Sequence, residues 1–202
     1  YYQLPGKSLE ICCMHLDKGQ MWIGTTTNGA YRLQLDKNEL THPILKGNIT
    51  SIYQDSEGEL WIGSWKEGLH HVKTDGTIEI FEYDAKNPYS ISSNFVRACC
   101  EDNLGNIWIG TFNGLNRYDK STGLFQNHTA SDAQSDGLTH SSIWCIVKDN
   151  QGTLWLGTYF GGVNYFNPEY EIYSRYMYSP IEKKGLSNPV VGRTIEDKNG
   201  NL

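Results

Sequence analysis

The sequence predicts an all-β fold, a β-propeller built from four-stranded blades, and three observations carry this prediction. First, a short tryptophan motif recurs at spacings of 39, 47 and 47 residues, which are typical of propeller blades. Second, each unit contains four short strand-like runs separated by Gly, Asp, Asn or Pro. Third, no window has the spacing of apolar residues that an amphipathic helix requires. A β-sandwich also has many short strands, but it does not require near-identical repeats in a fixed phase.

The repeated motif is a strand with apolar residues at consecutive positions. Its copies are "GQMWIGT" from Gly19, "GELWIGS" from Gly58, "GNIWIGT" from Gly105 and "GTLWLGT" from Gly152. Because neighbouring residues of a strand point to opposite faces, an apolar run of this kind must be buried on both faces. We therefore predict that the repeated tryptophans are structural core residues: Trp22, Trp61, Trp108 and Trp155.

An acidic turn precedes each of the last three tryptophans by six residues. Asp55, Asp102 and Asp149 each open an Asp-x-x-Gly sequence, and this pattern favours a type I turn between two strands. Asp17 lies one residue closer to Trp22, which predicts a tighter first turn. We predict a structural role for the three repeated aspartates.

The repeats also set the expected extent of the fold. They cover residues 1–202, which we predict to form a partial propeller of about four blades, with a fifth blade beginning near residue 188. The opening "YYQLPGKS" is typical of the outer strand of a preceding blade, and the final "GNL" falls one residue before an expected tryptophan. A partial ring would expose apolar blade faces, so we expect the chain to self-associate.

Composition and charge argue against several functions. The formal net charge of -6 and the absence of a Lys/Arg cluster argue against a nucleic-acid partner. No stretch approaches the roughly 18 consecutive apolar residues of a membrane span, and no signal-peptide pattern stands at the start. The five cysteines lack metal-ligand spacing and lie in short apolar runs, so we expect buried thiols, no metal site and no cofactor.

The repeat resembles the two-component regulator propeller repeat. The segment "NFVRACCEDNLGNIWIGTFNGLNRYDKSTGLF", residues 94–125, matches that pattern almost throughout, and the resemblance covers essentially the whole chain. It implies the extracytoplasmic, periplasmic sensor region of a membrane-anchored hybrid two-component histidine kinase of Bacteroidetes. Many members of that family sense oligosaccharides released from complex glycans, so the resemblance implies an oligosaccharide partner and a kinase elsewhere in the protein.

The loops that follow the repeated strand are the candidate binding site. The first strand of each blade would lie innermost, and these loops would lie on the ring face opposite the aspartate turns. Four residues after the repeated tryptophans stand Trp65, Phe112 and Tyr159, with Thr26 in the first blade. Three aromatic rings in one register would form an arc near the channel mouth, where sugars could stack on them. Their polar neighbours are Lys66, Glu67, Asn113, Tyr89, Asn94 and His140.

Other interpretations of these residues remain open. The loop aromatics could fill gaps between blades, and the propeller could be a scaffold that only mediates dimer contacts. An enzyme is a further alternative, because streptogramin-lyase propellers have similar "G-x-L-W" strands. Catalysis would need a converging acid and base, whereas the loop groups His140, Asp132, Asp136 and Glu67 are scattered without a paired spacing. We therefore predict no catalytic residue in this segment.

Overall fold

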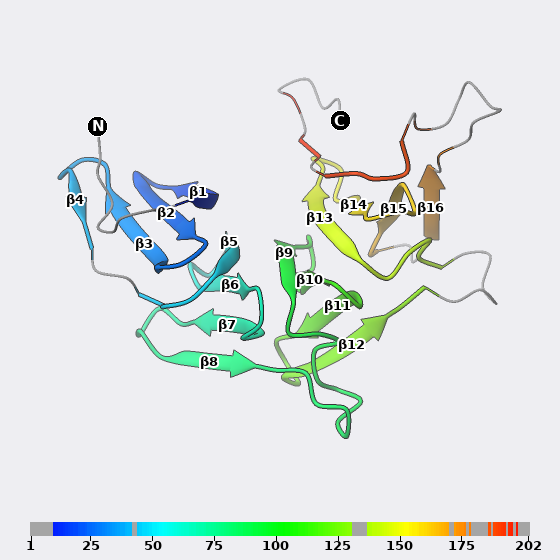
Figure 1. Cartoon of the computed structure of the whole chain (residues 1–202), viewed down its shortest axis with the longest axis horizontal. Coiled ribbons are helices and arrows are strands. Elements are labelled where there is room, and N and C mark those ends of the chain that lie inside the picture. The colour runs from blue at the N-terminus through cyan, green and yellow to red at the C-terminus, as the bar shows by residue number, and fades with distance from the viewer. Residues whose placement is uncertain are drawn as a thin grey trace.

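The computed structural model describes residues 10–41, 44–130 and 137–169, the backbone of 172–176, and short stretches or single positions between 178 and 197. This described part of the chain contains sixteen strands and no helix. The strands form four antiparallel four-stranded sheets, and the sheets follow one another in an arc (Figure 1). None of the described segments is a helix with the length and apolarity needed to cross a membrane.

Each sheet is formed by four strands that are consecutive in the sequence. The first sheet contains β1 (Ile11–Asp17), β2 (Gln20–Thr25), β3 (Gly29–Gln34) and β4 (Glu39–Leu40). The second contains β5 (Ile49–Gln54), β6 (Leu60–Ser64), β7 (Leu69–Val72) and β8 (Ile78–Phe81). The third contains β9 (Val96–Glu101), β10 (Ile107–Thr111), β11 (Gly114–Asp119) and β12 (Leu124–His128). The fourth contains β13 (Ile143–Lys148), β14 (Leu154–Thr158), β15 (Val163–Asn167) and β16 (Ile172–Tyr176).

The first strand of each sheet lies on the concave side of the arc. β1, β5, β9 and β13 contact one another in sequence order, while β4, β8, β12 and β16 lie on the outside (Figure 1). The prediction of an all-β partial propeller with four-stranded blades, and of an innermost first strand, is confirmed. The prediction that a fifth blade begins near residue 188 stays a prediction, and its final "GNL" lies outside the described residues.

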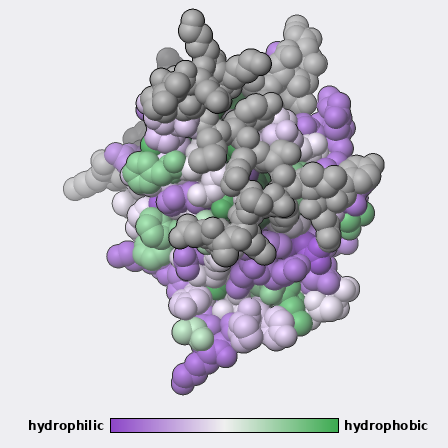
Figure 2. All heavy atoms as spheres, turned by 90° about the vertical axis from the view of Figure 1, so that its right-hand side faces the viewer, coloured by the Kyte–Doolittle hydropathy of each residue, from purple (hydrophilic) through white to green (hydrophobic). Residues whose placement is uncertain are grey.

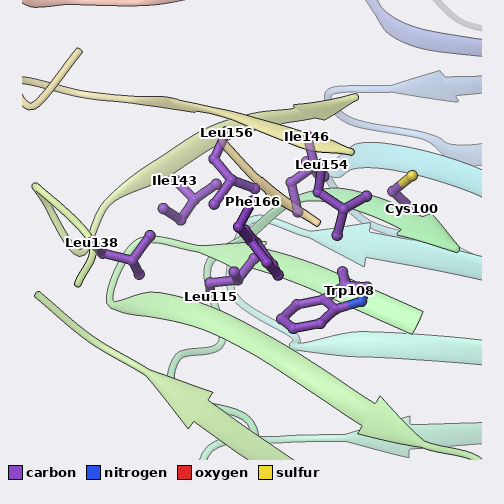
Figure 3. Close-up of a cluster of buried hydrophobic side chains, with 10 residues drawn as sticks. Cys100, Trp108, Leu115, Leu138, Ile143, Ile146, Leu154, Leu156 and Phe166 are labelled. Atoms are coloured by element: carbon purple, nitrogen blue, oxygen red, sulfur yellow. The ribbon is translucent and has the colours of Figure 1, made fainter. Parts of the chain in front are cut away.

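The hydrophobic core lies between neighbouring sheets. Trp108 and Leu115 of the third sheet pack against Ile143, Leu154 and Phe166 of the fourth (Figure 3). The Trp108 and Phe166 rings meet edge to face, with their centroids 5.0 Å apart, a favourable arrangement for two aromatic rings. Because each blade buries its face against the next blade, the repeated tryptophan contributes to cohesion between blades.

The other repeated tryptophans follow the same rule where a following sheet is described. Trp22 packs with residues of the second sheet, and Trp61, which has no exposed surface, packs with residues of the third. Trp155 is half-buried and stacks on Tyr165 of its own sheet, with 4.7 Å between the ring centroids.

The glycine of the Trp-x-Gly motif permits the close approach of neighbouring blades. A Cβ atom on Gly110 would lie 2.7 Å from Cγ2 of Ile143, and one on Gly63 would lie 2.6 Å from Cγ1 of Val96. Ile143 and Val96 belong to the innermost strand of the following sheet. A side chain at this position would therefore push two blades apart.

The aspartate turns have the predicted geometry. The backbone N–H groups of Gly58, Gly105 and Gly152 donate to the carbonyl oxygens of Asp55, Asp102 and Asp149, respectively, at 3.0, 3.3 and 3.1 Å. The tighter first turn is also confirmed, because Asp17 pairs directly with Gln20. Its two central residues have left-handed backbones, with φ of 43° at Lys18 and 81° at Gly19, as a type I′ hairpin turn requires.

The burial of three cysteines differs from the sequence-based expectation. Cys99 and Cys100 are buried, but Cys12, Cys13 and Cys145 are only half-buried because they lie at the concave edge of the sheets. The outer strands are also less covered than the motif strands, since β8 alternates between exposed and half-buried residues. On the side of the fourth sheet, the surface that is not grey in Figure 2 shows hydrophobic patches separated by hydrophilic residues.

Candidate functional site

Each innermost strand carries a β-bulge at an equivalent position. In the third sheet Val96 pairs with Thr111 and Ala98 with Gly110, so Arg97 is the extra residue. The same register shift makes Cys12, Thr50 and Trp144 the extra residues of β1, β5 and β13. Bulges commonly re-aim a side chain next to a functional site, and these four positions carry four different side chains.

All four bulge residues line one groove on the concave side of the arc. Its volume is about 670 Å³, and the strands β1, β5, β9 and β13 all contribute to its wall. Trp65, from the loop after β6, lies at its rim. The groove has the size of a typical small-molecule site, and its position corresponds to the channel side of a propeller.

Arg97 is the centre of an aromatic cluster at this groove. Its guanidinium carbon lies 4.0 Å from the ring centroid of Trp144, 5.4 Å from that of Phe112 and 5.6 Å from that of Trp65. A cation placed over aromatic faces is attracted by their negative faces. The three rings come from three different blades, so Arg97 connects side chains that are distant in the sequence.

The three aromatic residues of the loop register are all partly exposed and are linked through neighbouring rings. The rings of Trp65 and Phe95 meet edge to face with their centroids 5.5 Å apart, and the centroids of Phe95 and Phe112 are 6.1 Å apart. Tyr159 stacks on Trp144 with 5.6 Å between ring centroids. The exposed fractions are 38% for Trp65, 54% for Phe112 and 37% for Tyr159, so each ring has surface that its neighbours do not cover.

Three donor groups in this cluster have no acceptor within the described part of the chain. They are Nε and Nη1 of Arg97 and Nε1 of Trp144, and all three atoms are buried. Two hydroxyl groups on the same wall are already engaged, since Thr50 donates to the carbonyl oxygen of Val96 at 2.6 Å and Ser51 contacts the thiol of Cys99. Burial lowers the pKa of Arg97 from its usual value. These three donors are the buried hydrogen-bonding groups of the groove wall that have no partner in the described part of the chain.

Of the loop register, Thr26 and Trp65 line the main groove, whereas Phe112 and Tyr159 adjoin it through their contacts with Arg97 and Trp144. The remaining predicted site residues lie away from the groove. Lys66 and Glu67 line a smaller cavity of about 260 Å³ beside Trp65. The backbone N–H of Asn113 donates to Oγ1 of Thr111 at 3.1 Å, within the tight loop after β10. His140 is half-buried against Phe160, and its Nδ1 accepts a 3.0 Å hydrogen bond from the N–H of Ser142.

Two further polar residues of the predicted set have other positions. Asn94 accepts a 2.6 Å hydrogen bond from the N–H of Tyr83 and shapes the loop before β9. Tyr89 is 57% exposed in the same connection. Asp132 and Asp136 lie outside the described residues.

Sequence reasoning missed Arg97, Trp144 and Phe95. The signal was present, because Thr50, Arg97 and Trp144 each lie eleven residues before a repeated tryptophan. A position that varies this strongly inside a regular repeat is a candidate for a site-specific role. The direction of the side chain at this position could not be inferred from the sequence. Without a bulge, strict alternation along the strand would place that side chain on a blade face.

An acidic cluster at the aspartate turn between β5 and β6 forms an ion-pair network. Carboxylate oxygens of Asp55, Glu57 and Glu59 lie within 4.8 Å of one another, which suits a hard cation in principle. The ammonium group of Lys120 lies 3.0 Å from Asp55 and 2.9 Å from Glu57, and 3.7 Å from Glu101. Because Lys120 joins two carboxylates of this cluster from the neighbouring blade, and Glu59 contacts His71 at 2.6 Å, the arrangement is explained by blade cohesion.

The comparison with protein families identifies the repeats. Three segments match the family model described as "Two component regulator propeller": residues 43–66, 90–113 and 137–160. Each segment ends five residues after a repeated tryptophan and so contains the inner strand, the aspartate turn and the motif strand. No curated protein matches the chain.

Several solved structures share the fold. A crystal structure described as the extracellular domain of a hybrid two component system from B. thetaiotaomicron has a TM-score of 0.75 at 23% identity. A second such domain from the same organism has a TM-score of 0.75 at 18% identity, over 95% of this chain. This chain spans only 27% and 26% of the lengths of those two domains.

An enzyme has a similar fold as well. Virginiamycin B lyase from Staphylococcus aureus, crystallised with quinupristin, has a TM-score of 0.68 at 18% identity. The similarity covers 91% of this chain and 60% of the lyase. Because one fold carries both sensors and enzymes, the function must be argued from the site.

Proposed function

We propose that this chain, which carries two-component regulator propeller repeats, belongs to the extracytoplasmic sensor region of a hybrid two-component histidine kinase. In this proposal the segment is a non-catalytic module that binds a glycan-derived oligosaccharide in the concave groove. The family match and the shared fold with extracellular domains of two-component systems support the placement in a sensor. The periplasm and a membrane anchor follow from the same proposal.

The observation that carries the binding role is the aromatic cluster at the groove. Sugars bind where aromatic faces offer stacking surface and a few polar groups fix the orientation of the ring. Trp65, Phe112 and Tyr159 provide partly exposed rings from three blades, while Arg97 and Trp144 provide unused donors beside them. The groove is long enough along the arc to contact several blades at once.

The chemistry of the groove favours binding over catalysis. General acid–base catalysis requires a histidine, carboxylate or similar group in contact with the substrate. The described residues that line the groove include no His, Asp or Glu. His140, the histidine of the predicted loop face, is engaged with Ser142 and Phe160. The lyase-like alternative therefore lacks a candidate acid or base within this groove.

In the proposed mechanism the ligand acts by holding blades in one arrangement. An oligosaccharide that contacts Trp65, Phe112 and Tyr159 would bridge the second, third and fourth sheets. In this mechanism a dimer of sensors has two arrangements in equilibrium. The ligand can shift that equilibrium only by the difference in its binding free energy for the two arrangements. The resulting change in the relative placement of two propellers would bias the kinase across the membrane.

Isothermal titration calorimetry with oligosaccharides from a panel of depolymerised polysaccharides tests the binding role. We expect Trp65→Ala and Tyr159→Ala to weaken binding of the oligosaccharide that the wild type recognises, with unchanged far-UV circular dichroism. Leu104→Ala is the control, because Leu104 is also an exposed apolar residue, at 62%, but lies in the turn between β9 and β10. Wild-type affinity in both aromatic variants would exclude this site. No binding at all, together with self-association in sedimentation velocity, would favour the scaffold.

A further inference from the structure

We propose that the groove selects oligosaccharides that carry a carboxylate or sulfate group, and that Arg97 binds this anionic group. This inference rests on the proposed function and adds the chemical class of its ligand. It depends on the charge balance of the groove, on the packing of Arg97 and on the donors that have no acceptor.

The charge of the groove is positive and localised. Arg97 is the only charged side chain among the described residues that line it. The ion pairs in the described part of the chain involve other cations, namely Lys18, Lys73, Lys120 and His71. A partly buried guanidinium without a carboxylate partner is unfavourable, and an anion entering the groove would compensate it.

The packing of Arg97 holds its guanidinium group among three aromatic rings. Trp144 covers the guanidinium at 4.0 Å, and the rings of Phe112 and Trp65 lie within 5.6 Å of its central carbon. Aromatic contacts of this kind fix the position of the group before a ligand arrives. A guanidinium edge presents parallel N–H donors that match the two oxygens of a carboxylate or sulfate.

The unused donors point to an acceptor-rich ligand. Nε and Nη1 of Arg97 and Nε1 of Trp144 are buried without an acceptor in the described part of the chain. Thr50, the equivalent bulge residue of the second sheet, instead donates its hydroxyl to Val96. A neutral sugar hydroxyl could satisfy one donor, whereas an anionic group with several oxygens can satisfy two or three together.

The preference is tested by calorimetry of the purified protein with matched ligand pairs. Uronate oligosaccharides are compared with their carboxyl-reduced forms, and sulfated oligosaccharides with their desulfated forms. We expect at least one acidic member to bind about 10- to 100-fold more tightly than its neutral partner, which corresponds to one charge-assisted hydrogen-bond pair. The two sets of pairs distinguish a carboxylate from a sulfate ligand.

Arg97 variants assign the preference to this residue. Arg97→Gln should remove the preference by weakening the acidic ligand alone, and Arg97→Lys should restore it only in part because lysine lacks the planar fork. Lys37→Gln removes the same charge from the exposed turn between β3 and β4 and should leave both affinities unchanged. Thermal unfolding of Arg97→Gln checks folding, and we expect only a small change in stability, because the lost cation–π contacts are offset by the removal of an unpaired cation.

The outcomes separate this inference from the proposed function. Equal affinity for acidic and neutral partners, or an acidic preference that survives in Arg97→Gln, would overturn the inference while the proposed oligosaccharide binding stands. Failure of every acidic and neutral member of the panel to bind would overturn both.

Discussion

The indole Nε1 of Trp108 donates a 2.7 Å hydrogen bond to Oδ2 of Asp102, the residue that opens the turn before its strand. The other carboxylate oxygen of Asp102 accepts the backbone N–H groups of Leu104 and Asn106, both at 2.9 Å. One buried carboxylate thus holds the turn and the core tryptophan together. The same link joins Trp61 to Asp55 at 2.9 Å and Trp155 to Asp149 at 2.8 Å.

The first prediction concerns this carboxylate. Asp102→Ala leaves the indole N–H and two backbone N–H groups without their acceptor, so the free energy of unfolding should fall by about 2–4 kcal/mol. Denaturant unfolding measures this change. Asp75→Ala is the control, since Asp75 also caps a turn by accepting the N–H of Thr77 but has no indole partner. Equal effects of the two substitutions would contradict a special role for the tryptophan link.

The second prediction contrasts the core tryptophan with the loop aromatic four residues later. Trp108 is 3% exposed, whereas Phe112 is 54% exposed. Trp108→Ala should lower the free energy of unfolding by about 3–5 kcal/mol, and Phe112→Ala by about 0.5 kcal/mol or less. Thermal and denaturant unfolding of both variants check the contrast. A large destabilisation by Phe112→Ala would assign this ring to the core rather than to the ligand.

The third prediction concerns the close approach of the third and fourth blades. A methyl group on Gly110 would lie 2.7 Å from Cγ2 of Ile143, so Gly110→Ala should destabilise the protein by about 1–3 kcal/mol. In the double variant with Ile143→Ala, the methyl gains space, and the total loss should be smaller than the sum of the single losses. Strict additivity in this double-mutant cycle would show that the two positions do not meet.

The fourth prediction concerns the response to acid. Burial raises the pKa of Asp55, but hydrogen bonds from Trp61 and Lys120 outweigh burial and hold it below its ordinary value of 3.8. A depressed carboxyl pKa stabilises the fold above the unfolded-state value and loses this contribution as the pH falls through the folded-state value. The free energy of unfolding should therefore decline below about pH 4. Lys120→Met should make that decline shallower, and an unchanged pH profile would argue against the ion pair.

The fifth prediction concerns the buried thiols of the third sheet. Burial raises the pKa of Cys99 to about 12 and that of Cys100 to about 11. Because the thiolate is the reactive species, neither residue should be alkylated by iodoacetamide at pH 8 until the protein unfolds. Mass spectrometry of native and urea-unfolded samples locates the label. Rapid native labelling at these two positions would indicate that the third sheet opens readily.

Much of the fold was predictable because the blade repeat is encoded locally. Asp-x-x-Gly turns and apolar motif strands depend on residues that are close in the sequence, so Asp102 and Trp108 could be assigned as structural parts from the pattern alone. The direct hydrogen bond between these two residues was harder to predict, since it depends on how the strand folds back over the turn. The three loop aromatics were found because their register repeats with the same phase as the tryptophans.

The sequence by itself determined the strands, their order within each blade and the burial of three of the four repeated tryptophans, since these follow from period, turn chemistry and apolarity. Only the tertiary structure decided that Arg97, Trp65 and Trp144 line one groove and that Phe112 lies beside Arg97. The physical reason is the bulge on each innermost strand, which turns one side chain out of the blade and toward its counterparts on neighbouring blades. Contacts across blades join residues roughly 50 positions apart, and no local pattern specifies such a distance.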